Sequence, residues 1–346
     1  LDYDRAYDPI ILLSQPGLIF KMAEIKGDWD GLLFPSKVVI ADLDNDGDLD
    51  VVFPANGYDA SPFPQENFGI FIQQDNQFSD LNEQYPTLYN SDRGDGSGSF
   101  YHSAAVGDLN HDLSPDIFMG DMRQPFITDG KTKKMFSLQG LMDPNEGGNQ
   151  VLTSEIIDVL GGRELELVLV GHKFTSQILE FDTEYNIKNV VELPDNKTFK
   201  VANILGIASG DINADGLNDL IFTLSGGENF SYGGLQVLVQ TADGAFEDVT
   251  DDWFGVEPHS KHWTKKVSLM DIDGDADLDL ILGQTEPNDL HYYENVENNG
   301  FELRVIEDPL SGWERFHVGI DEQNLNVFLV NDTTDHDLII GEVSFA

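Results

Sequence analysis

Four stretches decide the fold: ADLDNDGDLDVVF at residues 41–53, GDLNHDLSPDIFM at 107–119, GDINADGLNDLIF at 210–222 and MDIDGDADLDLIL at 270–282. Counted from the first Asp, each has Asp or Asn at position 3, Asp at position 5 and Asp at position 9. An apolar run precedes each motif and another follows it. Such recurrence marks an internal repeat, and long-period repeats are typical of propellers, solenoids and repeat arrays.

The residues between the motifs extend the repeat. Each motif is followed downstream by two further apolar segments that read as a hairpin, so one period of about 50–60 residues holds four short strands, the pattern of a propeller blade. A weaker fifth copy covers residues 158–166, with Leu160 and Gly162 where the other copies have oxygen donors. A shortened sixth copy is expected near residues 331–337.

The fold prediction is therefore all-β: a six-bladed β-propeller that forms a single domain over residues 1–346. The surplus hairpin at residues 10–25 is expected to pair with the C-terminal strands, which closes the ring and removes the open sheet edges. A seven-bladed ring is the alternative. A β-solenoid of calcium repeats is less suitable, because its period is several-fold shorter.

The acidic motifs predict metal sites. Oxygen donors at positions 1, 3, 5 and 9, with a backbone carbonyl at position 7, suit Ca²⁺, which takes about six to eight oxygen ligands. Mg²⁺ is less suitable, since it keeps several of its waters. Gly47 and Gly216 stand where the backbone must turn sharply. About four calcium ions are expected, with these ligands: Asp42, Asp44, Asp46, Asp48 and Asp50; Asp108, Asn110, Asp112, Ser114 and Asp116; Asp211, Asn213, Asp215, Leu217 and Asp219; and Asp271, Asp273, Asp275, Asp277 and Asp279.

These loops, each entered from an apolar strand and left by a Leu, Val or Ile run, resemble the FG-GAP or VCBS repeat of integrin-α-type propellers and of many secreted bacterial proteins. The resemblance covers about residues 37–341. It implies a propeller stabilised by calcium in the loop between the first and second strands of a blade. Most members bind glycans or proteins, and some host lyases or lipases, so the fold does not fix the activity. The weak fifth copy and a count of six blades, where integrin-type rings have seven, depart from the family.

The net charge and the absence of cysteine exclude several classes of partner and site. The 346 residues carry 63 Asp and Glu against 19 Lys and Arg, a net charge of −44. This charge argues against nucleic-acid or anionic-membrane partners, because both repel an acidic surface. The absence of cysteine excludes disulfides, zinc–thiolate sites, iron–sulfur clusters and thiol nucleophiles. No apolar run is long enough for a membrane helix.

If the metal loops lie on one face of a propeller, basic and aromatic residues gather in the connections of the other face. Arg and Lys would pair with sulfate or carboxylate groups, and aromatic rings would stack on sugars. The predicted ligand contacts are Tyr101, His102, Arg123, His172, Lys173, His262, Trp263, Lys265, Trp313 and Arg315. The favoured function is thus a secreted binding module for an anionic polysaccharide or a surface protein.

Two alternatives stay open. In a polysaccharide lyase, His102 or His262 would remove the proton next to a uronate carboxylate that Arg123 or Lys265 neutralises. Alternatively, the chain is a structural or adhesion domain of a larger surface protein. The expected location is extracellular or the cell surface, with the periplasm as the alternative. Because the chain begins at Leu1, a removed leader or an excised domain is expected.

Overall fold

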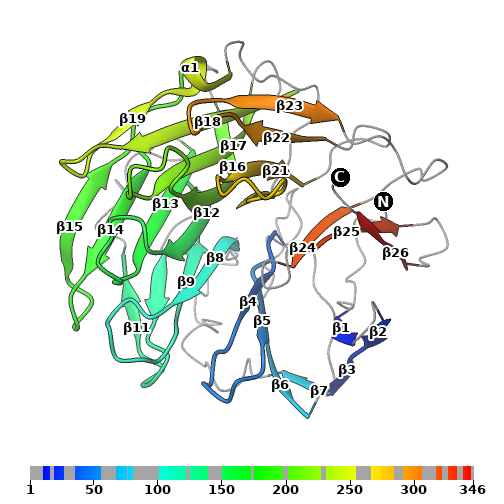
Figure 1. Cartoon of the computed structure of the whole chain (residues 1–346). Coiled ribbons are helices and arrows are strands. Elements are labelled where there is room, and N and C mark those ends of the chain that lie inside the picture. The colour runs from blue at the N-terminus through cyan, green and yellow to red at the C-terminus, as the bar shows by residue number, and fades with distance from the viewer. Residues whose placement is uncertain are drawn as a thin grey trace. The chain divides into compact units, whose positions relative to one another are not determined.

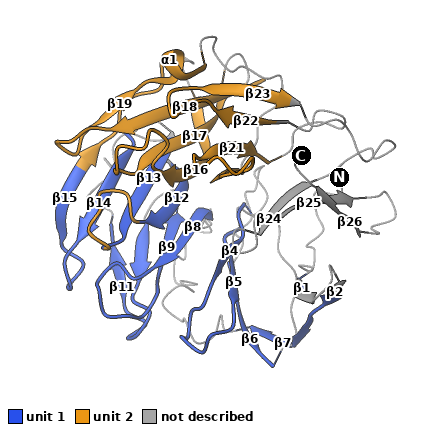
Figure 2. Ribbon diagram, viewed as in Figure 1, with its two compact units in different colours: residues 1–157, 164–190 blue, residues 158–163, 191–346 orange. Residues whose placement is uncertain are grey.

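The computed structural model describes residues 11–15, 19–26, 36–55, 68–75, 77–80, 101–121, 125–138, 150–172, 175–197, 202–226, 231–254, 266–283, 291–305, 317–321, 326–332 and 338–343. Nearly all the regular secondary structure of the described residues is β-strand (Figure 1), and α1 (Thr250–Phe254) is the one helix among them. The chain divides into two compact units (Figure 2): residues 1–157 with 164–190, and residues 158–163 with 191–346.

The described residues of the first unit form four sheets. One is the hairpin of β1 (Leu12–Gln15) and β2 (Ile19–Met22). The others are larger, and their strands lie in the following spatial orders: β3 (Glu24–Lys26), β7 (Gln77–Asp80), β6 (Gly69–Gln74), β5 (Asp50–Phe53), β4 (Val39–Ala41); β11 (Met135–Ser137), β10 (Phe126–Thr128), β9 (Asp116–Asp121), β8 (Tyr101–Gly107); and β12 (Gln150–Ile157), β13 (Glu166–His172), β14 (Gln177–Phe181), β15 (Ile187–Glu192), whose last two residues belong to the second unit.

The second unit repeats the same order of strands. Its sheets are β16 (Ala202–Gly210), β17 (Asp219–Gly226), β18 (Tyr232–Gln240), β19 (Phe246–Asp248); β20 (Val267–Met270), β21 (Asp279–Leu282), β22 (His291–Asn295), β23 (Phe301–Val305); and β24 (His317–Asp321), β25 (Asn326–Asp332), β26 (Leu338–Val343). Consecutive strands pair antiparallel, as in a propeller blade. The predicted all-β, blade-type architecture is confirmed for these sheets.

Neighbouring sheets pack through their first strands. In the first unit β8 lies against both β4 and β12, and in the second unit β16 lies against β20. Gly107 at the end of β8 allows this approach, since an added Cβ would come 2.4 Å from Cγ2 of Ile156 in β12. Sheets covered on both faces bury whole strands, and all eight residues of β17 are buried. This explains why the second strands read as continuous apolar runs.

Two expectations about the chain ends need revision. The N-terminal hairpin forms, but the following strand β3 pairs in parallel with β7 of its own unit. Ring closure by the N-terminal strands is therefore not confirmed, and the blade number stays a prediction. The shortened sixth copy was expected at residues 331–337. Asn331 and Asp332 instead end β25, the central strand of its sheet, so they do not stand between a first and a second strand as the complete motifs do, and residues 333–337 lie outside the described residues.

Candidate metal sites

Four complete acidic loops connect the first and second strands of their sheets: 42–50 after β4, 108–116 after β8, 211–219 after β16 and 271–279 after β20. All four use one backbone template, in which the residues at positions 4 and 6 have positive φ. These residues are Asn45, Gly47, His111, Leu113, Ala214, Gly216, Gly274 and Ala276. Because of these two left-handed residues, the chain turns sharply, and the side chains at positions 1, 3 and 5 point into the loop, where they accept its N–H groups.

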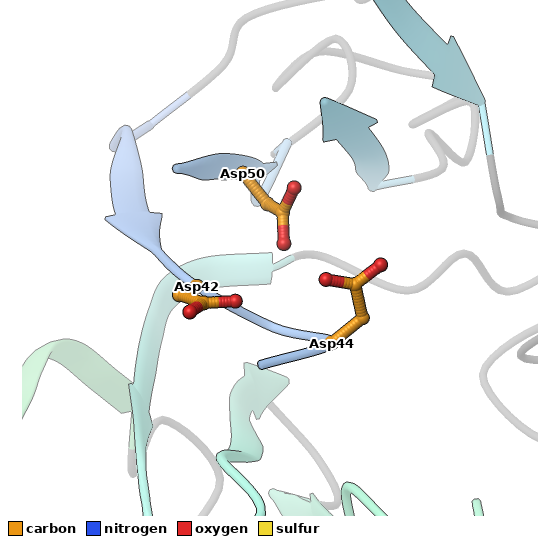
Figure 3. A group of neighbouring side chains, drawn as sticks. All are labelled: Asp42, Asp44 and Asp50. Atoms are coloured by element: carbon orange, nitrogen blue, oxygen red, sulfur yellow. The ribbon is translucent and has the colours of Figure 1, made fainter. Parts of the chain in front are cut away.

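Hydrogen bonds within loop 42–50 hold its acidic side chains in place. The carboxylate of Asp42 accepts the N–H of Asp46 (3.1 Å) and of Gly47 (3.0 Å). Oδ1 of Asp46 in turn accepts the N–H of Asp48 at 2.9 Å. Figure 3 shows that Asp42, Asp44 and Asp50 point toward one another, and each offers an oxygen within 4.8 Å of the others. Asp271, Asp273 and Asp275 also each offer an oxygen within 4.8 Å of the others. Such clusters offer the all-oxygen donor set that Ca²⁺ prefers.

The Asp at position 9 joins three strands of its sheet. In each loop it is 0% exposed, one oxygen accepts the N–H at position 2, and the other accepts an N–H at the end of the third strand or just after it. Asp219, for example, accepts the N–H of Ile212 at 3.1 Å and of Gln240 at 2.8 Å. The equivalent donors in the other loops are Leu43 and Gln73, Leu109 and Gly130, and Ile272 and Asn295.

Burial at position 9 disfavours the charged carboxylate. It raises the pKa of Asp50, Asp116 and Asp219 to about 6 and that of Asp279 in the same direction, against the lowering effect of their backbone hydrogen bonds. The pKa of Asp277 is also raised to about 6, first by burial and then by Asp275. A cation bound in the loop would favour the ionised form and offset this cost.

Loop 108–116 has additional partners from outside the repeat. The hydroxyl of Tyr185 donates toward Oδ1 of Asp116 (2.6 Å) and lies 2.9 Å from Oδ2 of Asp129. Nδ2 of Asn110 donates to the same Asp129 oxygen at 3.2 Å. Sequence reasoning missed Tyr185 and Asp129. The Asp129-Gly130 pair, a turn signal between β10 and β11, could have indicated a second polar segment beside this loop.

Neighbouring loops are connected within each unit. Nδ2 of Asn45 donates to the carbonyl of Leu113 at 3.0 Å, which joins loops 42–50 and 108–116. In the second unit, Nδ2 of Asn295 donates to the carbonyl of Ile212 (2.8 Å) and to that of Leu278 (3.3 Å). Asn295 thus bridges loops 211–219 and 271–279. Within each unit, the two complete acidic loops therefore lie side by side.

The weak copy at residues 158–166 keeps the backbone but not the ligands. Gly161 and Arg163 have positive φ, as at positions 4 and 6 of the complete loops, but Gly162 between them also has positive φ. Asp158 accepts the N–H of Gly161 at 3.0 Å. With Leu160 and Gly162 at positions 3 and 5, the inward-facing oxygen donors are absent, as the sequence indicated.

Few of the predicted ligand contacts fall on described side chains. Tyr101 is 5% exposed, and its ring packs edge-on against Phe68 and Phe126 in the core. This ring offers no face for stacking on a sugar. His102 is half-buried in β8, and His172 ends β13. Arg123, Lys173, His262, Trp263, Lys265, Trp313 and Arg315 lie outside the described residues.

Comparisons with known proteins address the fold and the repeat. The extracellular domain described as part of a hybrid two-component system from B. thetaiotaomicron is 12% identical, with a TM-score of 0.50, over 97% of this chain and 39% of that one. A Lactobacillus plantarum protein is 10% identical, with a TM-score of 0.46, over 85% of this chain and 81% of that one. The likeness to the first concerns the fold alone. A search of curated proteins gives no match.

The described part of the chain contains no helix with the length and apolar character needed to cross a membrane. The sequence model of the FG-GAP-like repeat family matches residues 211–282. That segment runs from the first Asp of one acidic loop, through β17 to β20, to the end of the strand that follows the next loop. The resemblance predicted from the acidic loops is thereby confirmed for residues 211–282, which are similar to the FG-GAP-like repeat family.

Proposed function

We propose that loops 42–50, 108–116, 211–219 and 271–279 each bind one calcium ion that stabilises its sheet. The observation that carries the proposal is the convergence of Asp42, Asp44 and Asp50, whose oxygens lie within 4.8 Å of one another. Like charges held so close repel one another unless a cation or a proton intervenes. The donors are carboxylate, amide and carbonyl oxygens, so the set fits a hard cation and not a thiophilic metal.

Calcium would add a connection between each acidic loop and the strands of its sheet. Positions 1, 3 and 5 lie in the loop, while position 9 begins the second strand and also accepts an N–H from the third-strand region. An ion held by both parts would fix the strands of one sheet. It would also neutralise part of the net charge of −44, which otherwise opposes the compact state.

The test is a calcium titration of the chelator-treated chain by calorimetry, together with thermal melts. We expect about four ions, and a gain of roughly 2.7 kcal/mol for each site at a hundredfold excess over its Kd. Asp42→Asn or Asp211→Asn should remove one site. Asp158→Asn, in the loop that lacks donors, is the matched control and should leave the number of ions unchanged. Identical melts in calcium and in chelator would refute the proposal.

As a second part of the proposal, we infer that the chain is an extracellular binding module for an anionic polysaccharide or a surface protein. Its support is the set of basic and aromatic residues that stand between the strands in the sequence of a strongly acidic chain: Arg123, Lys173, His262, Trp263, Lys265, Trp313 and Arg315. The solved extracellular domain that shares the fold fits the same location.

Binding to an array of sulfated and uronate glycans, measured with calcium and with chelator, tests this second part. Retention of acidic glycans by the calcium-loaded chain supports the binding module. New absorbance from an unsaturated product during incubation with uronate polymers would instead support the lyase alternative. If the chain neither retains a glycan nor degrades a polymer of the panel, the structural or adhesion role is the better explanation.

A further inference from the structure

One acidic loop has an unusual side chain at position 7. In loop 271–279 this residue is Asp277, which is 6% exposed although its neighbours Asp273 and Asp275 are exposed. Oδ1 of Asp277 is buried and has no hydrogen-bond partner. A buried carboxylate oxygen without a partner is costly, so its presence calls for a ligand that the carboxylate can bind.

The other three loops do not share this feature. Position 7 is Ser114 in loop 108–116 and Leu217 in loop 211–219, and neither provides a carboxylate. Loop 42–50 has Asp48 there, but Asp48 is only half-buried. The backbone is nevertheless alike, because the N–H of position 7 donates to the position 5 carboxylate in all four loops. The difference therefore lies in the side chain of Asp277.

The surroundings of Asp277 favour a cation. The carboxyl groups of Asp275 and Asp277 are close enough for a hydrogen bond, and Asp273 and Asp279 also act on Asp277 electrostatically. Asn295, which is 1% exposed, holds the following residues through its bonds to the carbonyl of Leu278 and to Asp279. Since its Nδ2 donates to two carbonyls, the orientation of its amide is fixed, and its Oδ1 is a second buried oxygen without a partner.

We propose that the side chain of Asp277 is itself a cation ligand, so that loop 271–279 binds calcium more tightly than the three other loops. This inference rests on the proposed calcium function. Five carboxylates then serve one loop, in place of the four-donor pattern with only a backbone carbonyl from position 7. Because the affinity of a calcium loop increases with the charge of its ligands and with its rigidity, this loop should be the first to fill.

Competitive titration of the full chain with calcium and a chromophoric chelator tests the inference. Asp271→Asn should abolish binding in this loop, so the phase that disappears from the titration belongs to loop 271–279. Asp277→Asn, which keeps the shape of the side chain, should weaken that same phase about tenfold or more. Asp195→Asn, at an exposed position of the same unit outside the acidic loops, is the control and should leave every phase within about twofold.

Thermal melts separate ligation from a structural role. In chelator, Asp277→Asn should melt at or above the wild type, because the substitution removes a buried negative charge beside Asp275. A lower melting temperature in chelator would show that Asp277 stabilises the fold without calcium, and would overturn the inference. An unchanged tightest phase in Asp277→Asn would also overturn it, while the calcium function would stand. A wild type that binds no calcium would refute the calcium function itself.

Discussion

The hydroxyl of Tyr185 lies 2.6 Å from Oδ1 of Asp116, although the two residues are 69 positions apart in the sequence. Tyr185 stands between β14 and β15, whereas Asp116 begins β9, so the bond joins two neighbouring sheets of the first unit. The ring of Tyr185 also packs on Phe136, with ring centroids 4.3 Å apart. The buried acidic residue of loop 108–116 is thus supported by the adjacent sheet as well as by its own.

Tyr185→Phe should therefore destabilise the chain by about 1.5–3 kcal/mol, the range for a hydrogen bond to a charged group. The substitution keeps the ring and its packing on Phe136, so the loss reports on the hydroxyl. Urea unfolding in chelator measures it. Tyr232→Phe is the control, since Tyr232 is 45% exposed and should change the stability little. Equal effects of the two substitutions would contradict the role assigned to the Tyr185 hydroxyl.

Loop 108–116 also stores backbone strain at position 6. Leu113 has φ of 70° and an exposed side chain, whereas loops 42–50 and 211–219 have glycine at this position. A non-glycine residue in the left-handed region costs about 1–2 kcal/mol, and glycine increases the entropy of the unfolded chain. Leu113→Gly should thus raise the stability by about 0.5–1 kcal/mol.

The reverse substitution supplies the comparison for this prediction. Gly216→Ala meets no atom within 4 Å of the added Cβ, so any cost comes from its φ of +87°. It should lower the free energy of unfolding by about 1 kcal/mol. Denaturant unfolding of both variants shows whether each substitution raises or lowers the free energy of unfolding. A stabilised Gly216→Ala would contradict the common backbone template.

The repeat could be predicted from the sequence because each part of it is local. Nine-residue loops and the apolar runs around them depend on neighbouring residues, so the second strands and the loops appear where the pattern places them. Gly47 and Gly216 also indicated the left-handed position 6. His111, Leu113 and Ala276 occupy the same conformation without a glycine signal, because the hydrogen bonds of the loop impose it.

Contacts between sheets could not be predicted in this way. The parallel pairing of β3 with β7 depends on where the N-terminal segment lies in space, and no local pattern encodes it. The same holds for Lys37, whose Nζ lies 2.5 Å from Oε1 of Glu155 in another sheet. Asp277 shows a further limit: its sequence position predicted a backbone ligand, whereas the burial of its side chain, on which the proposed ligand role rests, could not be predicted from the sequence.

The position 9 residues should matter for stability even without calcium. Asp219→Ala would leave the buried N–H groups of Ile212 and Gln240 without acceptors, at about 1–3 kcal/mol each. We expect a total loss of about 2–5 kcal/mol in chelator. Asp195→Ala, at an exposed position of the same unit, should stay within about 0.5 kcal/mol of the wild type. Urea unfolding followed by tryptophan fluorescence compares the two.

The pH dependence of stability should change sign when calcium is added. In chelator, the folded-state pKa values of Asp50, Asp116 and Asp219 are about 6, above the ordinary value of 3.8. The folded chain then binds more protons than the unfolded chain between these values. The contribution of these groups is therefore fully present below about pH 4 and is lost as the pH rises through 6.

With calcium bound, the folded chain should bind fewer protons than the unfolded chain, because the cation favours the ionised carboxylates and lowers their folded-state pKa values. The stabilisation that calcium provides should thus grow from pH 4 to pH 7, and calcium binding near pH 5.5 should release protons. The pKa of Asp129 is lowered by its hydrogen bonds, so its contribution to stability increases with pH, both in calcium and in chelator. The difference between the two stability curves therefore reports on the acidic loops. Melting temperatures from pH 4 to 7 with calcium and with chelator give that difference, and parallel curves would show that these aspartates do not respond to the ion.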